Sequence, residues 1–133
     1  MSGQYPDTFY RVAVKAVIKN DKGELLLVKE KSDKWDLPGG GLSHGESAEA
    51  GIKRELKEEV GASDIVVVKP ICVKSFWLEE KQAWLMWLIY SVELKSDELI
   101  LGDGVSEAKF LKPSVLAHSV DEREKFIGTF QKN

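Results

Sequence analysis

Three glutamates, Glu55, Glu58 and Glu59, lie close together shortly after a run of three glycines. Residues 46–60 have the apolar spacing of an amphipathic helix, and Gly61 stands where a C-terminal cap would. At about 100° per residue, Glu59 and Glu55 fall within or beside the apolar stripe of this helix, and Glu58 lies next to them. The stripe is formed by Ala48, Ile52, Leu56 and Val60.

Carboxylates on the buried side of a helix repel one another, and burial favours their protonated form unless a cation neutralises them. Hard divalent cations such as Mg²⁺ and Mn²⁺ bind oxygen ligands and keep waters that a phosphate can replace. The helix therefore predicts a divalent metal site. Arg54, at i,i+4 to Glu58, can pair with it, and Gly51, without a side chain, would leave room for a ligand to approach.

The glycine run 39–41 is predicted to be a break in regular structure. A backbone without Cβ atoms can turn tightly and let a metal or a ligand approach its carbonyls and amides. Pro38 stiffens the entry to this loop. His44, further along it, either contacts a phosphate or faces solvent.

Residues 40–62 resemble the Nudix box, G-x5-E-x7-R-E-U-x-E-E-x-G-U, in which U is aliphatic. The fixed positions are filled by Gly40, Glu46, Arg54, Glu55, Leu56, Glu58, Glu59 and Gly61, and the last aliphatic place by Ala62. The preceding segment WDLPGG is also similar to the family. The resemblance implies a MutT-like Nudix hydrolase with an α/β (α+β) fold, an α/β/α sandwich around a mixed central sheet. Residues 1–133 are expected to form a single domain of this kind.

The resemblance implies Mg²⁺- or Mn²⁺-dependent hydrolysis of a nucleoside diphosphate linked to another moiety. By position, Glu58 and Glu59 are metal ligands, Glu55 is a ligand or the general base, and the Gly40 carbonyl can add a ligand. Arg54 and Glu46 would brace the loop against the helix. Many members supply a further acidic residue from a later loop. Here that residue is Glu107 or, as second choice, Asp103, although Glu107 equally suits a surface carboxylate.

The substrate is less well defined by the sequence. Signatures typical of ADP-ribose, dinucleoside polyphosphate, coenzyme A and NADH hydrolases are missing, which favours a (d)NTP or an oxidised nucleotide. An ADP-ribose, nucleotide-sugar or dinucleoside polyphosphate hydrolase is the alternative. Trp77, where ADP-ribose hydrolases tend to have a proline, either stacks on a base or belongs to the core. Arg11 and Lys15 share a strand face and either bind phosphates with the backbone of Gly39 and Gly41 or form a solvated edge.

Functions of other classes are also compatible with the fold. A nucleotide sensor without catalysis would not need the complete acidic set, and metal-dependent turnover separates the two. A protein-interaction module could use exposed tryptophans as anchors. Isoprenoid diphosphate isomerases share the Nudix fold but pair a cysteine with a glutamate, and Cys72 is the sole cysteine here.

The remaining elements must hold the helix and the loop in place. Residues 10–19 and 24–30 are predicted to be strands joined as a hairpin by the turn 20–23. Strands are expected at 64–78, 82–95 and 107–112, and a second amphipathic helix at 121–130. This order predicts a mixed sheet with helices packed on it.

Length, composition and charge limit the classes of protein to which the chain can belong. The chain has 133 residues, 43% hydrophobic and 31% charged, as expected for one compact domain. Its net charge of −3 argues against a general nucleic-acid binder. With neither a secretory signal nor an apolar span, a cytoplasmic protein is expected that acts on a small nucleotide and does not bind membranes, as a monomer or a homodimer. Cys72 excludes an internal disulfide and a four-cysteine zinc site and is expected to be a buried small hydrophobe.

Overall fold

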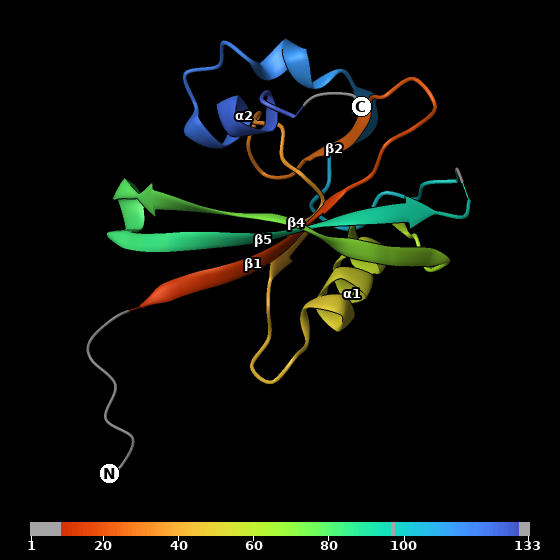
Figure 1. The fold of residues 1–133 in the computed structure, drawn as a ribbon, viewed down its shortest axis with the longest axis horizontal. Helices are drawn as coiled ribbons and strands as arrows, with labels where there is room; N and C mark the ends of the chain where they lie inside the picture. The colour runs from red at the N-terminus through yellow and green to blue at the C-terminus, as the bar shows by residue number, and fades with distance from the viewer. Residues whose placement is uncertain (1–8, 97, 131–133) are drawn as a thin grey trace.

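The computed structural model describes residues 9–96 and 98–130. Figure 1 shows a layered arrangement in which α1 covers one face of a central sheet, and α2 and the strand β2 lie on the other face. The α/β sandwich with a mixed sheet is therefore confirmed. The helices and strands are β1 (Tyr10–Val17), β2 (Leu25–Lys29), β3 (Gly39–Gly41), α1 (Ala48–Val60), β4 (Ile65–Leu78), β5 (Ala83–Leu94), β6 (Glu107–Leu111) and α2 (Glu122–Ile127), with short 3₁₀ turns η1 (Glu79–Lys81) and η2 (Pro113–Leu116).

The central sheet has the strand order β3-β1-β5-β4, and β2 pairs with β6 in a separate two-stranded sheet. In the central sheet β1 runs parallel to β5 and antiparallel to β3, while β4 and β5 form an antiparallel pair. The prediction of a break in regular structure at residues 39–41 is wrong, because this run is the edge strand β3. Its three glycines face Ala13, Val14 and Lys15 of β1.

The predicted hairpin of strands 10–19 and 24–30 is also wrong. The turn closes as expected through the bridge Lys19↔Leu25 and the bond from the Asn20 amide to the Glu24 carbonyl, but the two strands then diverge into different sheets. The reason is that β1 is central. Its alternate residues enter the two cores on opposite faces, and its edges are taken by β3 and β5. Local alternation alone does not show which partner a strand will take.

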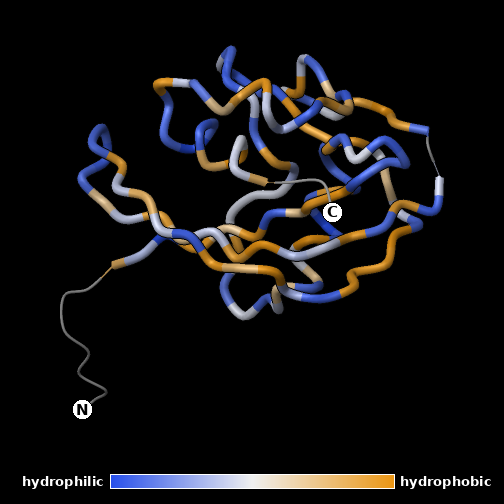
Figure 2. The backbone as a smooth tube through the Cα atoms, turned by 45° about the horizontal axis from the view of Figure 1, so that its top comes forward, coloured by the Kyte–Doolittle hydropathy of each residue, from blue (hydrophilic) through white to orange (hydrophobic). Residues whose placement is uncertain are grey.

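Two hydrophobic cores flank the central sheet. One lies between the sheet and α1 and contains Ile52, Leu56 and Val60 of the helix. The other lies toward α2 and contains Trp87 and Phe76 of the sheet. Figure 2 shows hydrophobic stretches along the strands and hydrophilic residues at the turns.

Helix α1 is fixed at both ends by its own sequence. The Ser47 hydroxyl accepts the Ala50 amide at the N-terminus, so the helix begins at Ala48 rather than at residue 46 as predicted. Gly61 adopts the left-handed conformation with φ of 69° and ends the helix, which confirms the predicted cap. The amides of Ile100 and Gly102 then bind the last carbonyls of α1. The end of the helix that carries Glu58 and Glu59 is therefore anchored.

The other predicted elements agree with the structure to within a few residues, except that the second helix is shorter than residues 121–130 and spans Glu122–Ile127. Its N-cap is Asp121, whose carboxylate accepts the amides of Arg123 and Glu124. None of the helices in the described part of the chain has the length and hydropathy needed to cross a membrane.

Candidate active site

The three glycines of β3 each meet a different neighbour. Gly39 has a φ of 137°, and a Cβ atom there would collide with the Val14 carbonyl. A Cβ at Gly40 would lie 2.7 Å from the carboxyl carbon of Glu55, and one at Gly41 would collide with the Arg11 guanidinium. The bare backbone of β3 therefore brings an acidic and a basic side chain against adjacent residues of one strand.

Glu59 is the buried member of the acidic group. It is 5% exposed, and its Oε1 atom accepts the Gly39 amide at 2.8 Å. Desolvation raises its pKa to about 8, the Gly39 hydrogen bond and Lys15 oppose the rise, and Glu30 and Glu55 add to it. The position of Glu59 in the apolar stripe is thus confirmed. A carboxyl group held in this way favours a cation nearby.

Glu55 and Glu58 differ from Glu59 and from each other in exposure. The Glu55 side chain is 14% exposed and faces Gly40, whereas that of Glu58 is 61% exposed. The helix therefore offers carboxylates along a gradient from core to solvent. The exposed carboxylates can reach a ligand beside the helix, while the buried one anchors the group to the core.

Arg54 connects the glycine strand to α1. Its guanidinium donates to both oxygens of Glu46, at 2.7 and 2.9 Å, and to the Gly41 carbonyl at 3.1 Å. It also donates to Glu55 at 2.9 Å and, more weakly, to Glu58 at 3.4 Å. The hydrogen bond from Arg54 lowers the pKa of Glu46 to about 2 and raises that of Arg54. The predicted contact with Glu58 exists, but Glu46 is the main partner.

Replacing Arg54 with lysine tests this arrangement. A lysine keeps the charge but cannot make the paired bonds to Glu46 and also reach Gly41, so Glu55 would lose its fixed position. We expect kcat/KM on any hydrolysed nucleotide to fall about 100-fold. Lys53→Arg, in the exposed pair with Glu49, is the matched control and should have wild-type kinetics. Wild-type activity of Arg54→Lys would contradict a positioning role for the guanidinium.

The room expected at Gly51 is not open to a ligand. A Cβ atom there would lie 2.6 Å from the Leu42 methyl group and 3.2 Å from a Glu46 oxygen. Leu42, just after β3, packs against α1 at this point. Gly51 therefore allows the loop to approach the helix closely, and that prediction was wrong.

Lys15 is buried rather than part of a solvated edge. It is 5% exposed, donates to Asp36 Oδ2 at 3.0 Å and to the Leu37 carbonyl at 3.2 Å, and lies 5.0 Å from the centre of the Trp87 ring. Its ammonium therefore neutralises part of the negative charge of Asp36, Glu59 and Glu30. Arg11, on the same strand face, is exposed and lies over Gly41.

Glu30 and Asp36 belong to the acidic surroundings and were not predicted. Desolvation raises the pKa of Glu30, Lys15 opposes the rise, and Asp36 and Glu55 add to it. The Oδ1 atom of Asp36 is buried without a hydrogen-bond partner. The available signal was the acidic residue directly after the buried strand β2.

The remaining predicted residues lie outside β3 and α1. Glu107 begins β6 and pairs with Lys29 at 3.7 Å and Lys109 at 4.0 Å, and Asp103 is exposed in a turn. His44 is exposed in its loop. Trp77 is 42% exposed, and its indole donates to Glu79 at 2.8 Å. Cys72 is half-buried in the sheet, and desolvation raises the pKa of its thiol, as suits a small hydrophobic residue.

Divalent cations suit the donor chemistry of this group. Carboxylate oxygens dominate it, and the desolvated Glu59 and the unpartnered oxygen of Asp36 both favour a nearby positive charge. Within residues 9–96 and 98–130, however, no three acidic, histidine or cysteine side chains converge into a ready-made metal site. Arg54 instead binds Glu55 and Glu58. Ligand binding would therefore require these side chains to turn.

A cleft of about 690 Å³ adjoins the acidic group through Glu30 and Asp36. Its lining contains four cationic and four acidic residues, so its formal charges balance; they are Lys31, Lys34, Lys81 and Arg123, and Glu30, Asp36, Glu80 and Asp121. Trp35 forms part of the wall, and its amide donates to the buried Glu124 at 2.7 Å. With divalent cations at its carboxylates, a cleft that has cationic side chains and an aromatic wall suits a ligand that combines phosphates with a base.

Two relatives with known names are similar in sequence to this chain. An ADP-ribose pyrophosphatase of Methanocaldococcus jannaschii is 30% identical over 126 residues, covering 91% of this chain and 73% of that protein. An RNA pyrophosphohydrolase of Ruthia magnifica is 51% identical over 55 residues, covering 41% of this chain and 31% of that protein. The chain thus spans about a third of the length of that RNA pyrophosphohydrolase.

Solved structures show the same fold. The MutT protein from Methanosarcina mazei superposes with a TM-score of 0.76 at 22% identity, over 93% of this chain and 94% of that one. A NUDIX hydrolase from Nitrosomonas europaea gives a TM-score of 0.68 at 26% identity, over 77% and 72%. In sequence, residues 9–129 match the family model of the NUDIX domain. With the complete box on β3 and α1, this match shows that the chain belongs to the Nudix family.

Proposed function

We propose that this protein is a metal-dependent pyrophosphohydrolase that cleaves a phosphoanhydride bond in a nucleoside diphosphate linked to another moiety. The observation that carries the proposal is the buried Glu59, fixed to the Gly39 amide and in electrostatic contact with Glu55 and with Glu30, a residue of the cleft wall. Carboxylates whose pKa is raised by burial cluster at functional sites.

The residues of the box would share the work in the following way. Glu59, Glu55, Glu58 and the Gly40 carbonyl would hold Mg²⁺ or Mn²⁺, with Glu107 as a further ligand from β6. When bound, the metal neutralises phosphate charge and makes a water more acidic. Glu55 would accept the proton of the attacking water at a carboxylate oxygen, and Arg54 would hold that carboxylate in place.

The cleft would hold the nucleotide beside these carboxylates. Arg11 and the Gly41 amide would contact phosphates, whereas the Gly39 amide donates to Glu59, so Gly39 would act by holding that carboxylate. Trp77, in the hollow that adjoins the cleft, would contact the base. Lys15 donates to Asp36, a residue of the cleft wall, and to the Leu37 carbonyl, so it would act by fixing the wall at Asp36. The cationic side chains of the cleft would attract the polyphosphate and keep it in line for attack.

A (d)NTP or an oxidised nucleotide is the first substrate that we propose. ADP-ribose is the second candidate, because the relative that is similar over 91% of the chain is named for it. The cleft volume lies within the range of about 300–1,000 Å³ that small ligands occupy. A mononucleotide with a further group attached therefore suits its size.

The test is a panel of canonical and oxidised dNTPs, ADP-ribose, nucleotide sugars and dinucleoside polyphosphates, each with Mg²⁺, with Mn²⁺ and with a chelator. Chromatography of the products identifies the bond that breaks. We expect rapid cleavage of one class, dependent on the metal. Nucleotide binding without cleavage of any compound would contradict the proposal and favour a sensor.

A further inference from the structure

Three charged side chains are buried in the part of the chain that the structure describes, and all three bind the backbone of residues 35–39. They are Lys15, Glu59 and Glu124. The Lys15 ammonium donates to the Leu37 carbonyl at 3.2 Å. Glu59 accepts the Gly39 amide at 2.8 Å. Glu124 accepts the Trp35 amide at 2.7 Å. The first two side chains have roles in the proposed function, which leaves the burial of the Glu124 carboxylate to be explained.

Glu124 joins two walls of the cleft, although its own side chain is not part of the lining. One wall lies within residues 30–36 and includes Trp35, and another is the start of α2 at Asp121. The other oxygen of the Glu124 carboxylate accepts the Ser119 hydroxyl at 2.7 Å, and the Ser119 oxygen accepts the Asp121 amide at 3.0 Å. A chain of three hydrogen bonds therefore runs from the Trp35 amide on one wall to the Asp121 amide on the other.

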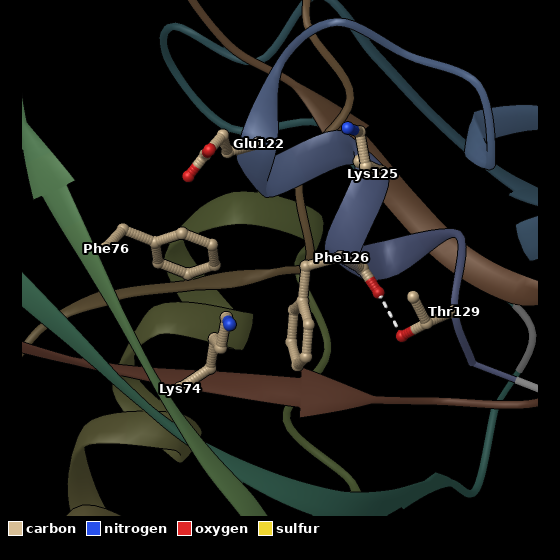
Figure 3. Close-up of a pocket in the computed structure, with 6 residues that line it drawn as sticks. All are labelled: Lys74, Phe76, Glu122, Lys125, Phe126 and Thr129. Atoms are coloured by element: carbon tan, nitrogen blue, oxygen red, sulfur yellow. Dashed lines mark hydrogen bonds between the residues drawn. The ribbon is translucent and has the colours of Figure 1, made fainter.

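Helix α2 has other contacts that hold it on the sheet. Ile127 is fully buried in the core on this side of the sheet. The ring of Phe126 lies edge to face with those of Phe76 and Trp87, with centroids 5.9 and 6.3 Å away. Figure 3 shows the Phe126 side chain projecting from α2 toward the strands. A buried carboxylate is not needed for this packing and costs free energy in desolvation, so we infer that Glu124 serves to position the cleft wall.

A displacement of Trp35 should remain local. The next residue, Asp36, exchanges two backbone hydrogen bonds of 2.9 Å with Val28. Its carboxylate also accepts the Lys15 ammonium at 3.0 Å. These bonds separate Trp35 from the part of the segment that holds Glu59. Loss of the Glu124 hydrogen bond would therefore loosen the cleft wall and leave the acidic group of α1 in place.

We propose that Glu124 is a positioning residue for nucleotide binding, which holds Trp35 and the start of α2 at the separation that the bound nucleotide requires. The proposal rests on the proposed function, which places the nucleotide in this cleft. Trp35 supplies the aromatic wall, and a ring contributes to binding only where it lies in contact with the ligand. Glu124 thus acts on nucleotide binding through Trp35, and the chemical step at the carboxylates of α1 does not depend on it.

Replacing Glu124 with methionine removes the acceptor and keeps the length of the side chain. We expect KM for the nucleotide that the panel identifies to rise about tenfold and kcat to change by less than about twofold. Glu124→Gln keeps an acceptor for the Trp35 amide, so its KM should stay within about twofold of the wild type. Lys125→Met, at an exposed position of the same helix, is the matched control and should have wild-type kinetics.

Ser119→Ala gives a second test, which holds even if the methionine variant does not fold. It removes the other hydrogen bond of the Glu124 carboxylate and should raise KM about threefold. An unchanged KM in the folded variants would overturn the proposal. A fall in kcat as large as the rise in KM would also overturn it, because a general loss of structure acts on both. An equal rise in KM for Glu124→Gln would overturn it as well, since the hydrogen bond would then not be what matters.

Binding measurements separate this inference from the proposed function. The probes are AMP, GMP, CMP and UMP, which contain no phosphoanhydride bond, and the method is calorimetry without a metal. The wild type should bind at least one of them, and Glu124→Met should bind it about tenfold more weakly. Such a difference without turnover of any compound would leave the role of Glu124 standing and refute the hydrolase. Turnover with an unchanged KM in the variants would do the reverse, and a wild type that neither binds nor cleaves any nucleotide would refute both.

Discussion

Replacing Glu59 with glutamine should abolish turnover and at the same time stabilise the metal-free protein at alkaline pH. Glutamine has the same shape, and its carbonyl can still accept the Gly39 amide. It cannot supply the anionic oxygen that a divalent cation needs. We expect kcat to fall on the order of a thousandfold.

The gain in stability follows from the raised pKa of Glu59. The pKa is about 8 in the folded protein and 4.5 when the carboxyl is unperturbed. Between these values the folded state binds a proton that the unfolded state has released, so the free energy of unfolding falls as pH rises. The contribution of the Glu59 proton to the free energy of unfolding is fully present below pH 4.5 and lost by about pH 8. Glutamine removes the ionisation, so at pH 9 the variant should be more stable by on the order of 2 kcal/mol.

Denaturant unfolding of chelator-treated protein at several pH values between 5 and 9 measures this difference in the free energy of unfolding. The difference should keep the same sign and grow with pH. Added Mg²⁺ should stabilise the wild type at high pH and have little effect on the variant. Glu49→Gln, on the exposed face of the same helix, is the control and should keep both the activity and the pH trend of the wild type. A Glu59→Gln variant that is less stable than the wild type at pH 9 would show that the carboxylate is already compensated by Lys15.

Those parts of the site that are coded within one helix could be predicted from the sequence. The 100° rotation placed Glu59 in the buried stripe, and Gly61 marked the end of α1 because a left-handed cap favours glycine. Both features depend on residues a few positions apart. The arrangement of Glu59, Glu55 and Glu58 from core to solvent follows from the same rotation.

The long-range partners could not be predicted in this way. Glu124 lies 89 residues from Trp35 in the chain, yet it accepts the Trp35 amide and the Ser119 hydroxyl and so fixes the cleft wall. Lys15 and Asp36 likewise meet only because β1 is central in the sheet. The alternation in residues 10–19 and 24–30 was read as a hairpin for the same reason, since it does not reveal which strands pair.

Replacing Gly39 with alanine should destabilise the protein far more than the same change at Gly41. The φ of 137° at Gly39 is one that residues with a Cβ rarely adopt, and the new methyl group would meet the backbone carbonyl of Val14. That carbonyl belongs to the central strand β1 and cannot move without disturbing both cores. We expect a loss of about 3 kcal/mol or more in the free energy of unfolding.

At Gly41 the methyl group would meet the guanidinium of Arg11, the end of an exposed and flexible side chain. Arg11 can turn aside, so the expected loss is below about 1 kcal/mol. Urea unfolding of the two variants side by side measures both values, and similar losses would contradict this difference. The Gly39 amide also holds Glu59. The Gly39→Ala variant should therefore be less active than the wild type even at a low temperature at which it is folded, because Glu59 would be displaced. The first glycine of the run is thus required by the backbone that supports the acidic site, whereas the third mainly leaves space for the side chain of Arg11.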